Sequence, residues 1–190
     1  MIAGLLLAAG GARRFGAQKL VRSVADKPLV RHAAEALAIA TDELFVVVGH
    51  DAAAVRDALA TVRCAFVENA DWATGIASSV GAGVSAMPAN TEAVVVALGD
   101  QPGIDPRTVQ RLIECWRTTS APIVSARYRG TRGHPVLFDR QVFRELLALE
   151  GDVGAKAAIE RDPARVAYVD LDQELPRDVD TPGDLASLRG

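Results

Sequence analysis

The chain is organised around its N-terminal segment, Leu5-Leu6-Leu7-Ala8-Ala9-Gly10-Gly11-Ala12-Arg13-Arg14-Phe15-Gly16-Ala17-Gln18-Lys19. It continues an apolar run from Met1 that has the length of one buried strand, and it ends in glycines and cations. Backbone N–H groups in such a loop are open to a ligand, because glycine has no Cβ to block the approach. Flexible cations beside them favour a polyanion, most simply a nucleoside triphosphate. The plainer interpretation is a strand-to-helix turn with solvated arginines.

The composition limits the classes of protein that this chain can belong to. Its 190 residues fit one α/β domain over residues 1–190 better than two. Hydrophobic residues make up 49% and aromatic residues only 5%, so the core is aliphatic. The net charge of −3 gives no basic excess for nucleic-acid binding. Cys64 and Cys115 lack the spacing of a metal motif and favour a reducing compartment.

The opening apolar run does not predict export or membrane insertion. It is about nine residues long, carries no preceding charge and leads directly into Arg13-Arg14, unlike a signal peptide. No apolar run in the sequence approaches the ~20 residues of a transmembrane helix. We therefore expect a cytoplasmic protein with no membrane partner.

Short apolar runs predict strands at residues 2–8, 44–48, 93–98 and 123–126, and later at 136–138 and 166–171. The first four are continuous rather than alternating, which is typical of strands covered by helices on both faces. Helices are expected between them, at 27–39, 51–60, 80–87 and from Asp105 to Trp116, with Asp51 and Asp105 as N-caps. Residues 128–135 are expected to form a polar connection, and further helices follow at 142–149, 155–160 and after Thr181. The order predicts a three-layer, Rossmann-like α/β fold with a mostly parallel sheet.

Asp100 follows the strand at 93–98 directly. Ligands of open α/β sheets gather at the carboxyl ends of strands, so Asp100 is expected to share a crevice with Arg14 and Lys19. An aspartate is a hard oxygen ligand suited to Mg²⁺. The alternative is an aspartate that caps a turn favoured by Pro102 and Gly103.

Three other groups of polar residues have two interpretations each. Ser78 and Ser79 can contact a base or ribose, or cap the helix that follows them. His134 stands in a loop, where a lone histidine is more often structural than catalytic. Asp178 and Asp180 alternate along an extended segment, so at most one is expected to share a metal with Asp100.

Two common phosphate-binding motifs match this segment only weakly. Gly11 and Gly16 fit GxxxxGK[ST], but Ala17 stands where the lysine is required. The dinucleotide motif GxGxxG is not matched either.

The segment LAAGGARRFGAQKL resembles the signature LAAGxxxRxGxxK of the MobA-like nucleoside triphosphate transferases. Later blocks look similar in the same order and span nearly the whole chain: Asn69…Trp72…Gly75…Ser78-Ser79, Gly99-Asp100-Gln101-Pro102, Arg132-Gly133-His134-Pro135, Gly151-Asp152…Gly154-Ala155 and Asp178-Val179-Asp180-Thr181-Pro182. The set is most similar to the molybdenum cofactor cytidylyltransferase branch.

This resemblance implies transfer of CMP from CTP to the phosphate of the molybdenum-molybdopterin cofactor, with release of pyrophosphate. The implied catalytic residues are Arg14, Lys19 and Asp100, and Mg²⁺ would be held by Asp100 with Asp178 or Asp180. Implied nucleotide contacts are Leu7, Ala8, Ala9, Gly10, Gly11, Arg14, Lys19, Ser78, Ser79 and Asp100. The acceptor side would be formed by Gln101, Gly133, His134 and Pro135, and a molybdoenzyme that receives the product would be a further partner.

Two other functions are compatible with these residues. One is a nucleotidyltransferase that acts on another phosphorylated acceptor, such as a sugar or polyol phosphate. The other is a non-catalytic carrier that delivers the molybdenum cofactor to a hydroxylase. The carrier predicts cofactor binding without pyrophosphate release from any nucleotide.

Overall fold

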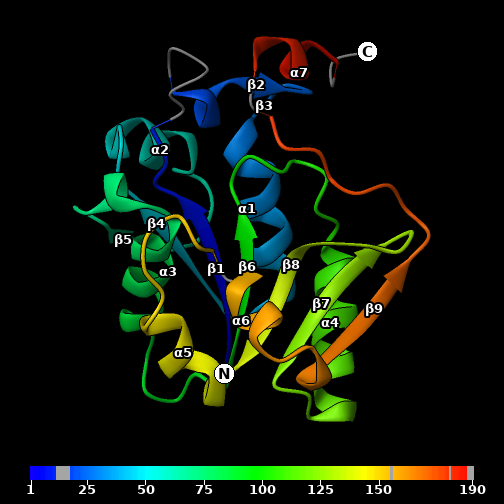
Figure 1. The fold of residues 1–190 in the computed structure, drawn as a ribbon. Helices are drawn as coiled ribbons and strands as arrows, with labels where there is room; N and C mark the ends of the chain where they lie inside the picture. The colour runs from blue at the N-terminus through cyan, green and yellow to red at the C-terminus, as the bar shows by residue number, and fades with distance from the viewer. Residues whose placement is uncertain (12–17, 155, 180, 188–190) are drawn as a thin grey trace.

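The computed structural model describes residues 1–11, 18–154, 156–179 and 181–187, and a seven-stranded sheet forms its centre (Figure 1). The strand order is β5-β4-β1-β6-β8-β7-β9. The strands are β1 (Ile2–Ala8), β4 (Glu43–Val48), β5 (Ala65–Glu68), β6 (Ala93–Leu98), β7 (Ile123–Tyr128), β8 (Thr131–Asp139) and β9 (Val166–Leu171). Four of the six neighbouring pairs are parallel, and β8 runs antiparallel to both of its neighbours. The predicted mostly parallel α/β sheet is confirmed.

Both faces of the sheet are covered, as the side chains of β1 show. Successive side chains of a strand point to opposite faces. Ile2, Leu6 and Ala8 belong to one hydrophobic cluster, whereas Leu5 and Leu7 belong to a second. All seven residues of β1 are buried. The continuous apolar run therefore reflects a strand with two buried faces, as expected from the sequence.

Helices pack on each face and complete the three layers. The first cluster includes side chains of α1 (Leu29–Ala40), α2 (Ala52–Ala58), α4 (Pro106–Thr119) and α7 (Pro182–Ser187). The second includes side chains of α3 (Ile76–Ser85), α5 (Phe143–Leu147) and α6 (Lys156–Arg161). Two short strands, β2 (Ser23–Val24) and β3 (Lys27–Pro28), pair with each other outside the main sheet. The described residues also form 3-10 turns: η1 (Lys19–Val21), η2 (Trp72–Thr74), η3 (Arg140–Val142) and η4 (Pro163–Arg165). No helix in the described part of the chain is long and apolar enough to cross a membrane.

Helix boundaries follow the predicted caps at some positions and not at others. Asp105 caps α4, since its Oδ1 accepts a hydrogen bond from the Arg107 N–H at 2.8 Å. Asp51 occupies the N-cap position of α2 but makes no capping side-chain hydrogen bond. The helix expected from residue 27 begins at Leu29, because Pro28 is extended and pairs with Ser23. Thr181 and Asp184 form reciprocal hydrogen bonds at the start of α7, as the predicted cap requires.

The prediction of a polar connection at residues 128–135 was wrong. Strand β7 continues to Tyr128, and β8 begins at Thr131 after a two-residue turn. Arg129 and Gly130 both have positive φ, 44° and 89°, which is the backbone of a tight hairpin. The polar, glycine-containing segment is therefore strand, and the predicted strand at 136–138 is only its buried half. Strand β5 was not predicted at all.

The antiparallel direction of β8 decides where its first residues lie. Val136 pairs with Val96 of β6, so the residues before Val136 extend towards the carboxyl end of β6. His134 consequently lies at the same edge of the sheet as Asp100. A parallel strand would have carried this segment to the opposite edge.

Candidate functional site

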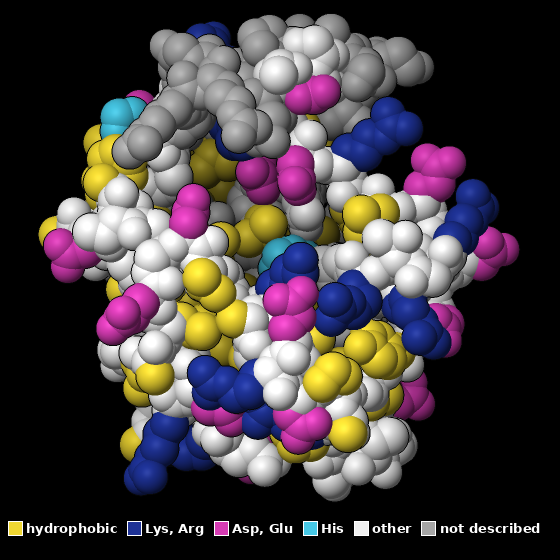
Figure 2. All heavy atoms as spheres, viewed as in Figure 1, with side chains coloured by type: hydrophobic (Ala, Val, Ile, Leu, Met, Phe, Trp, Pro, Cys, Tyr) yellow, Lys and Arg dark blue, Asp and Glu magenta, His cyan; other side chains and the backbone are white. Residues whose placement is uncertain are grey.

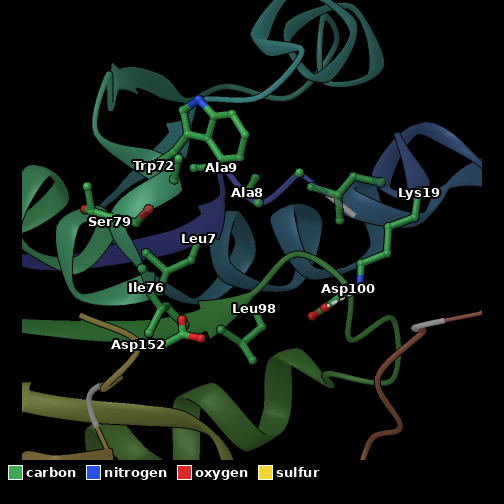
Figure 3. A pocket seen from close by; sticks show the side chains of 16 residues that line it. Leu7, Ala8, Ala9, Lys19, Trp72, Ile76, Ser79, Leu98, Asp100 and Asp152 are labelled. Atoms are coloured by element: carbon green, nitrogen blue, oxygen red, sulfur yellow. Dashed lines mark hydrogen bonds and ion pairs between the residues drawn. The ribbon is translucent and has the colours of Figure 1, made fainter. Parts of the chain in front are cut away.

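A cavity of about 490 Å³ lies where β1 and β6 end (Figure 3). Its walls are formed by Leu7, Ala8, Ala9, Gly10, Gly11, Lys19, Leu20, Trp72, Ala73, Thr74, Gly75, Ile76, Ser79, Leu98, Asp100 and Asp152. Eight of the predicted nucleotide contacts are among these residues: Leu7, Ala8, Ala9, Gly10, Gly11, Lys19, Ser79 and Asp100. Figure 2 shows this face of the molecule hollowed near its centre, with acidic side chains above the hollow and lysine or arginine side chains below it.

The end of β1 forms one wall because neighbouring strands hold its backbone. The Gly99 N–H donates to the Leu7 carbonyl oxygen at 3.0 Å, and the His50 N–H donates to the Ala9 carbonyl oxygen at 3.0 Å. Leu7 to Gly11 therefore lie between the chain ends of β6 and β4. A Cβ on Gly11 would stand 2.9 Å from Cζ3 of Trp72, so the glycine is required for the indole to lie there.

Lys19 and Asp100 form the charged side of the cavity. The Lys19 Nζ lies 2.8 Å from the Asp100 Oδ2, and the two side chains are only 12% and 23% exposed. Gln18 fixes the start of η1, since its buried side chain donates from Nε2 to the His50 carbonyl oxygen at 2.8 Å. The contact between Lys19 and Asp100 places these two side chains at one cavity, where the sequence analysis also expected Arg14. Arg14 lies outside the described residues.

An aromatic wall stands across the cavity from this pair, formed by Trp72. A Cβ on Gly49 would stand 2.7 Å from the Trp72 Cβ, so two glycines, Gly11 and Gly49, make room for this side chain. The rings of Trp72 and His50 lie 5.1 Å apart between centroids and are tilted by 52°. The indole is thus held in place while it lines the cavity. Nothing in the sequence analysis assigned a role to Trp72, although it stands in one of the blocks that carry the family resemblance.

Asn69 organises the segment that joins Trp72 to α3. Its Nδ2 donates to the hydroxyl oxygens of Ser78 and Ser79 at 2.9 and 3.0 Å, and its Oδ1 accepts from the Asp71 N–H at 3.0 Å. Helix α3 begins at Ile76 with Gly75 as its N-cap, so the prediction that a serine caps a helix at 80–87 was wrong. Ser79 lines the cavity, whereas the Ser78 hydroxyl donates to the Asp71 and Gly75 carbonyl oxygens.

Gln101, Asp178 and His134 form a second polar group behind Asp100. The Gln101 Nε2 donates to the Asp178 Oδ1 at 2.7 Å, and the Val179 N–H donates to the Asp100 carbonyl oxygen at 3.1 Å. Burial lowers the pKa of the His134 imidazole, and the negative charges of Asp178 and Asp100 partly offset this shift. The sequence placed these residues in three separate blocks, and the fold brings them together.

None of the four predicted acceptor residues lines the cavity described above. Gln101 is 6% exposed and held by Asp178. Leu175 covers Gly133, since a Cβ there would collide with its Cδ1. His134 and Pro135 lie in strand β8, and the His134 carbonyl oxygen accepts a hydrogen bond from the Tyr128 hydroxyl at 2.8 Å. Their role towards an acceptor stays a prediction.

The donor set around Asp100 fits a magnesium ion that is shared with a substrate. Mg²⁺ is commonly held by one or two carboxylates together with phosphate oxygens and water. Asp100 is one such carboxylate at the cavity wall. Asp178 is not among the lining residues, and its Oδ1 accepts a hydrogen bond from the Nε2 of Gln101, the residue after Asp100. Within the described residues, no group of three or more histidine, cysteine, aspartate or glutamate side chains could hold a metal alone. Asp180 lies outside these residues.

Comparison with known proteins places this site in context. Residues 4–166 match the family described as the MobA-like NTP transferase domain. The nicotine blue oxidoreductase of Paenarthrobacter nicotinovorans is 33% identical over 191 residues, which cover 95% of this chain and 92% of that protein. The crystal structure of Rv0371c from Mycobacterium tuberculosis has a TM-score of 0.86 at 30% identity, covering 99% of this chain and 96% of that chain. The same mycobacterial protein in complex with manganese gives a TM-score of 0.82 at 29% identity, covering 99% and 97%.

Proposed function

We propose that this chain, which belongs to the MobA-like NTP transferase family, transfers a nucleotidyl group to a phosphorylated acceptor. The observation that carries the proposal is the Lys19–Asp100 pair at 2.8 Å, on the wall of a cavity formed by the glycine-containing loop after β1. A cation, a carboxylate and open backbone N–H groups are the parts that a triphosphate and its metal require. The donor that we propose is CTP, and the acceptor is the phosphate of the molybdenum-molybdopterin cofactor.

The reaction is a displacement at the α-phosphorus. An oxygen of the acceptor phosphate forms a bond to this phosphorus, the bond to the bridging oxygen of the β-phosphate breaks, and pyrophosphate leaves with the electron pair. The acceptor phosphate is already ionised at neutral pH, so no side chain has to remove a proton. Catalysis then depends on alignment and on neutralising negative charge.

Among the described residues, Lys19 supplies positive charge that would neutralise the triphosphate. Lys19 is the first residue of η1, and its ammonium group, paired with Asp100, lies at the cavity where the β- and γ-phosphates would bind. Arg14 is proposed as a second cation for the triphosphate. Asp100, together with Asp178 or Asp180, would hold Mg²⁺, which when bound neutralises charge on the phosphate oxygens as a Lewis acid.

Pyrophosphate release tests the proposal directly. The full chain is incubated with Mg²⁺, one nucleoside triphosphate at a time and one acceptor at a time: the molybdenum cofactor, a sugar phosphate or a polyol phosphate. We expect release above background with CTP and the molybdenum cofactor, and its loss in K19M and D100N. Release with another acceptor would instead identify the other nucleotidyltransferase considered above. Cofactor binding without release from any nucleotide would indicate the carrier.

A second candidate function follows from the name of a full-length relative. The nicotine blue oxidoreductase aligns with 95% of this chain, so oxidoreductase activity on the same fold is the second function to test. Loss of the nicotine blue absorbance with a reduced nicotinamide dinucleotide, and no pyrophosphate release with any acceptor, would favour it. The absence of a GxGxxG motif in the loop after β1 argues for the transferase.

A further inference from the structure

Asp152 is a cavity residue to which the proposed reaction gives no role. It stands in the segment between α5 and α6, far along the chain from the other charged residues of the cavity. Its side chain is exposed at the cavity wall, next to the apolar Ile76 and Leu98 (Figure 3). In that view Asp152 and the Lys19–Asp100 pair lie on opposite sides, with Leu98 between them.

The segment that carries Asp152 is fastened to the beginning of α3. The Ala77 N–H donates to the Gly151 carbonyl oxygen at 3.1 Å. Gly75 has a φ of +126°, and a Cβ on it would collide with the same Gly151 carbonyl group. Gly154 lies against Ile76, since a Cβ there would stand 3.5 Å from the Ile76 Cγ2. Asp152 is therefore placed by tertiary contacts on both sides of it.

The two carboxylates of the cavity differ in their partners. Asp100 has the Lys19 ammonium at 2.8 Å. Asp152 has no hydrogen bond or ion pair with any group in the part of the chain that the structure describes. An unpaired carboxylate repels phosphate and accepts hydrogen bonds, but it cannot donate them. The triphosphate is consequently favoured on the Lys19 side, and the Asp152 side is left for an uncharged part of the ligand that carries N–H or O–H groups.

We propose that Asp152 is a specificity-determining residue, which accepts hydrogen bonds from the uncharged nucleoside part of the donor nucleotide. This inference rests on the proposed function, because it assumes that a nucleoside triphosphate occupies the cavity. The donors that a carboxylate recognises on a nucleoside are the ribose hydroxyl groups and the exocyclic amino group of cytosine, adenine or guanine. The Asp152 carboxylate can accept a hydrogen bond from either the ribose hydroxyl groups or the amino group of the base. The nucleotides in the test are chosen to distinguish these two.

The test is a binding measurement, so it does not depend on turnover. Calorimetry of the full chain with Mg²⁺ compares CTP, ATP, GTP, UTP, 2′-deoxy-CTP and inorganic pyrophosphate. The variants are D152N, which keeps the shape and removes the charge, and E150Q, which removes an exposed charge nearby that does not line the cavity. Thermal unfolding of both variants establishes that they are folded.

We expect D152N to weaken binding of the preferred ribonucleotide about tenfold, since the asparagine oxygen still accepts a hydrogen bond but no longer carries the charge that strengthens it. Binding of pyrophosphate should be unchanged, and E150Q should bind every ligand as the wild type does. If the effect of D152N disappears with 2′-deoxy-CTP, the ribose is the group recognised. If it disappears with UTP but persists with 2′-deoxy-CTP, the amino group of the base is recognised.

The proposal would be contradicted if D152N did not weaken nucleotide binding. A carboxylate that only repels the triphosphate would give equal or tighter nucleotide binding in D152N, and this would overturn the role of Asp152 while leaving the proposed reaction intact. Weaker binding in D152N without pyrophosphate release by the wild type would leave the role of Asp152 standing and reject the reaction. A wild-type chain that binds no nucleotide would reject both.

Discussion

Replacing Asp100 by asparagine should separate the structural from the catalytic part of the Lys19–Asp100 contact. The side chains are 12% and 23% exposed, so the pair lies between a surface ion pair, worth about 0–1 kcal/mol, and a fully buried one, whose disruption costs about 3–5 kcal/mol. We expect D100N to lower the free energy of unfolding by about 1–2 kcal/mol. For a chain of this size, that corresponds to a fall in melting temperature of roughly 2–8 °C.

A double-mutant cycle with K19M turns this estimate into a test. Part of the D100N cost arises because Lys19 loses the Asp100 carboxylate, so K19M/D100N should be more stable than the sum of the single effects, with a coupling of about 1 kcal/mol. Pyrophosphate release should fall by about a hundredfold or more in each single variant, and the double variant should not recover it. Stability is followed by thermal unfolding and activity by pyrophosphate release.

The matched control is D170N on β9. Asp170 pairs with Arg127 through two hydrogen bonds, but its side chain is 66% exposed and it does not line the cavity. Its substitution should lower stability much less than D100N does and leave pyrophosphate release unchanged. The reasoning would be refuted by a coupling energy near zero between Lys19 and Asp100, or by a D100N variant as active as D170N.

Four further changes have defined outcomes. W72A should weaken nucleotide binding about tenfold by calorimetry, because it removes the aromatic wall, whereas W72F should retain most of the affinity. G75A should lower the free energy of unfolding by about 2 kcal/mol or more in a chemical denaturation experiment, since φ is +126° and the new Cβ has no room; an unchanged midpoint would contradict the fastening described above. Because burial lowers the pKa of His134, the unfolded chain binds that proton more readily, so stability should decline as the pH falls below 6.5; H134Q should show a shallower decline in melting temperature over this range. R165K should destabilise the chain by about 1 kcal/mol, because only arginine can donate both 2.6 Å hydrogen bonds to Glu145; equal melting temperatures would argue against a bidentate pair.

Site residues that follow the end of a predicted strand could be placed from the sequence. Asp100 follows an apolar run directly, and Lys19 follows another through a glycine loop, so both were expected at the carboxyl edge of a parallel sheet. The 2.8 Å contact between them agrees with that reasoning. The residues that were missed, Trp72 and Asp152, lie in segments without periodicity, where local patterns give no direction to a side chain.

Local patterns are enough to predict the layered architecture, since continuous apolar runs such as β1 require helices on both faces, and to place the start of the glycine loop and Asp100 at one edge of the sheet. Which other residues reach that edge depends on tertiary packing. The antiparallel insertion of β8 between β6 and β7 brings His134 towards Asp100. The contact of Gly75 with Gly151 holds Asp152 at the cavity wall. The positions of His134 and Asp152 both depend on contacts between segments that are far apart in the sequence. Such contacts depend on how the whole core packs and not on the residues next to each site.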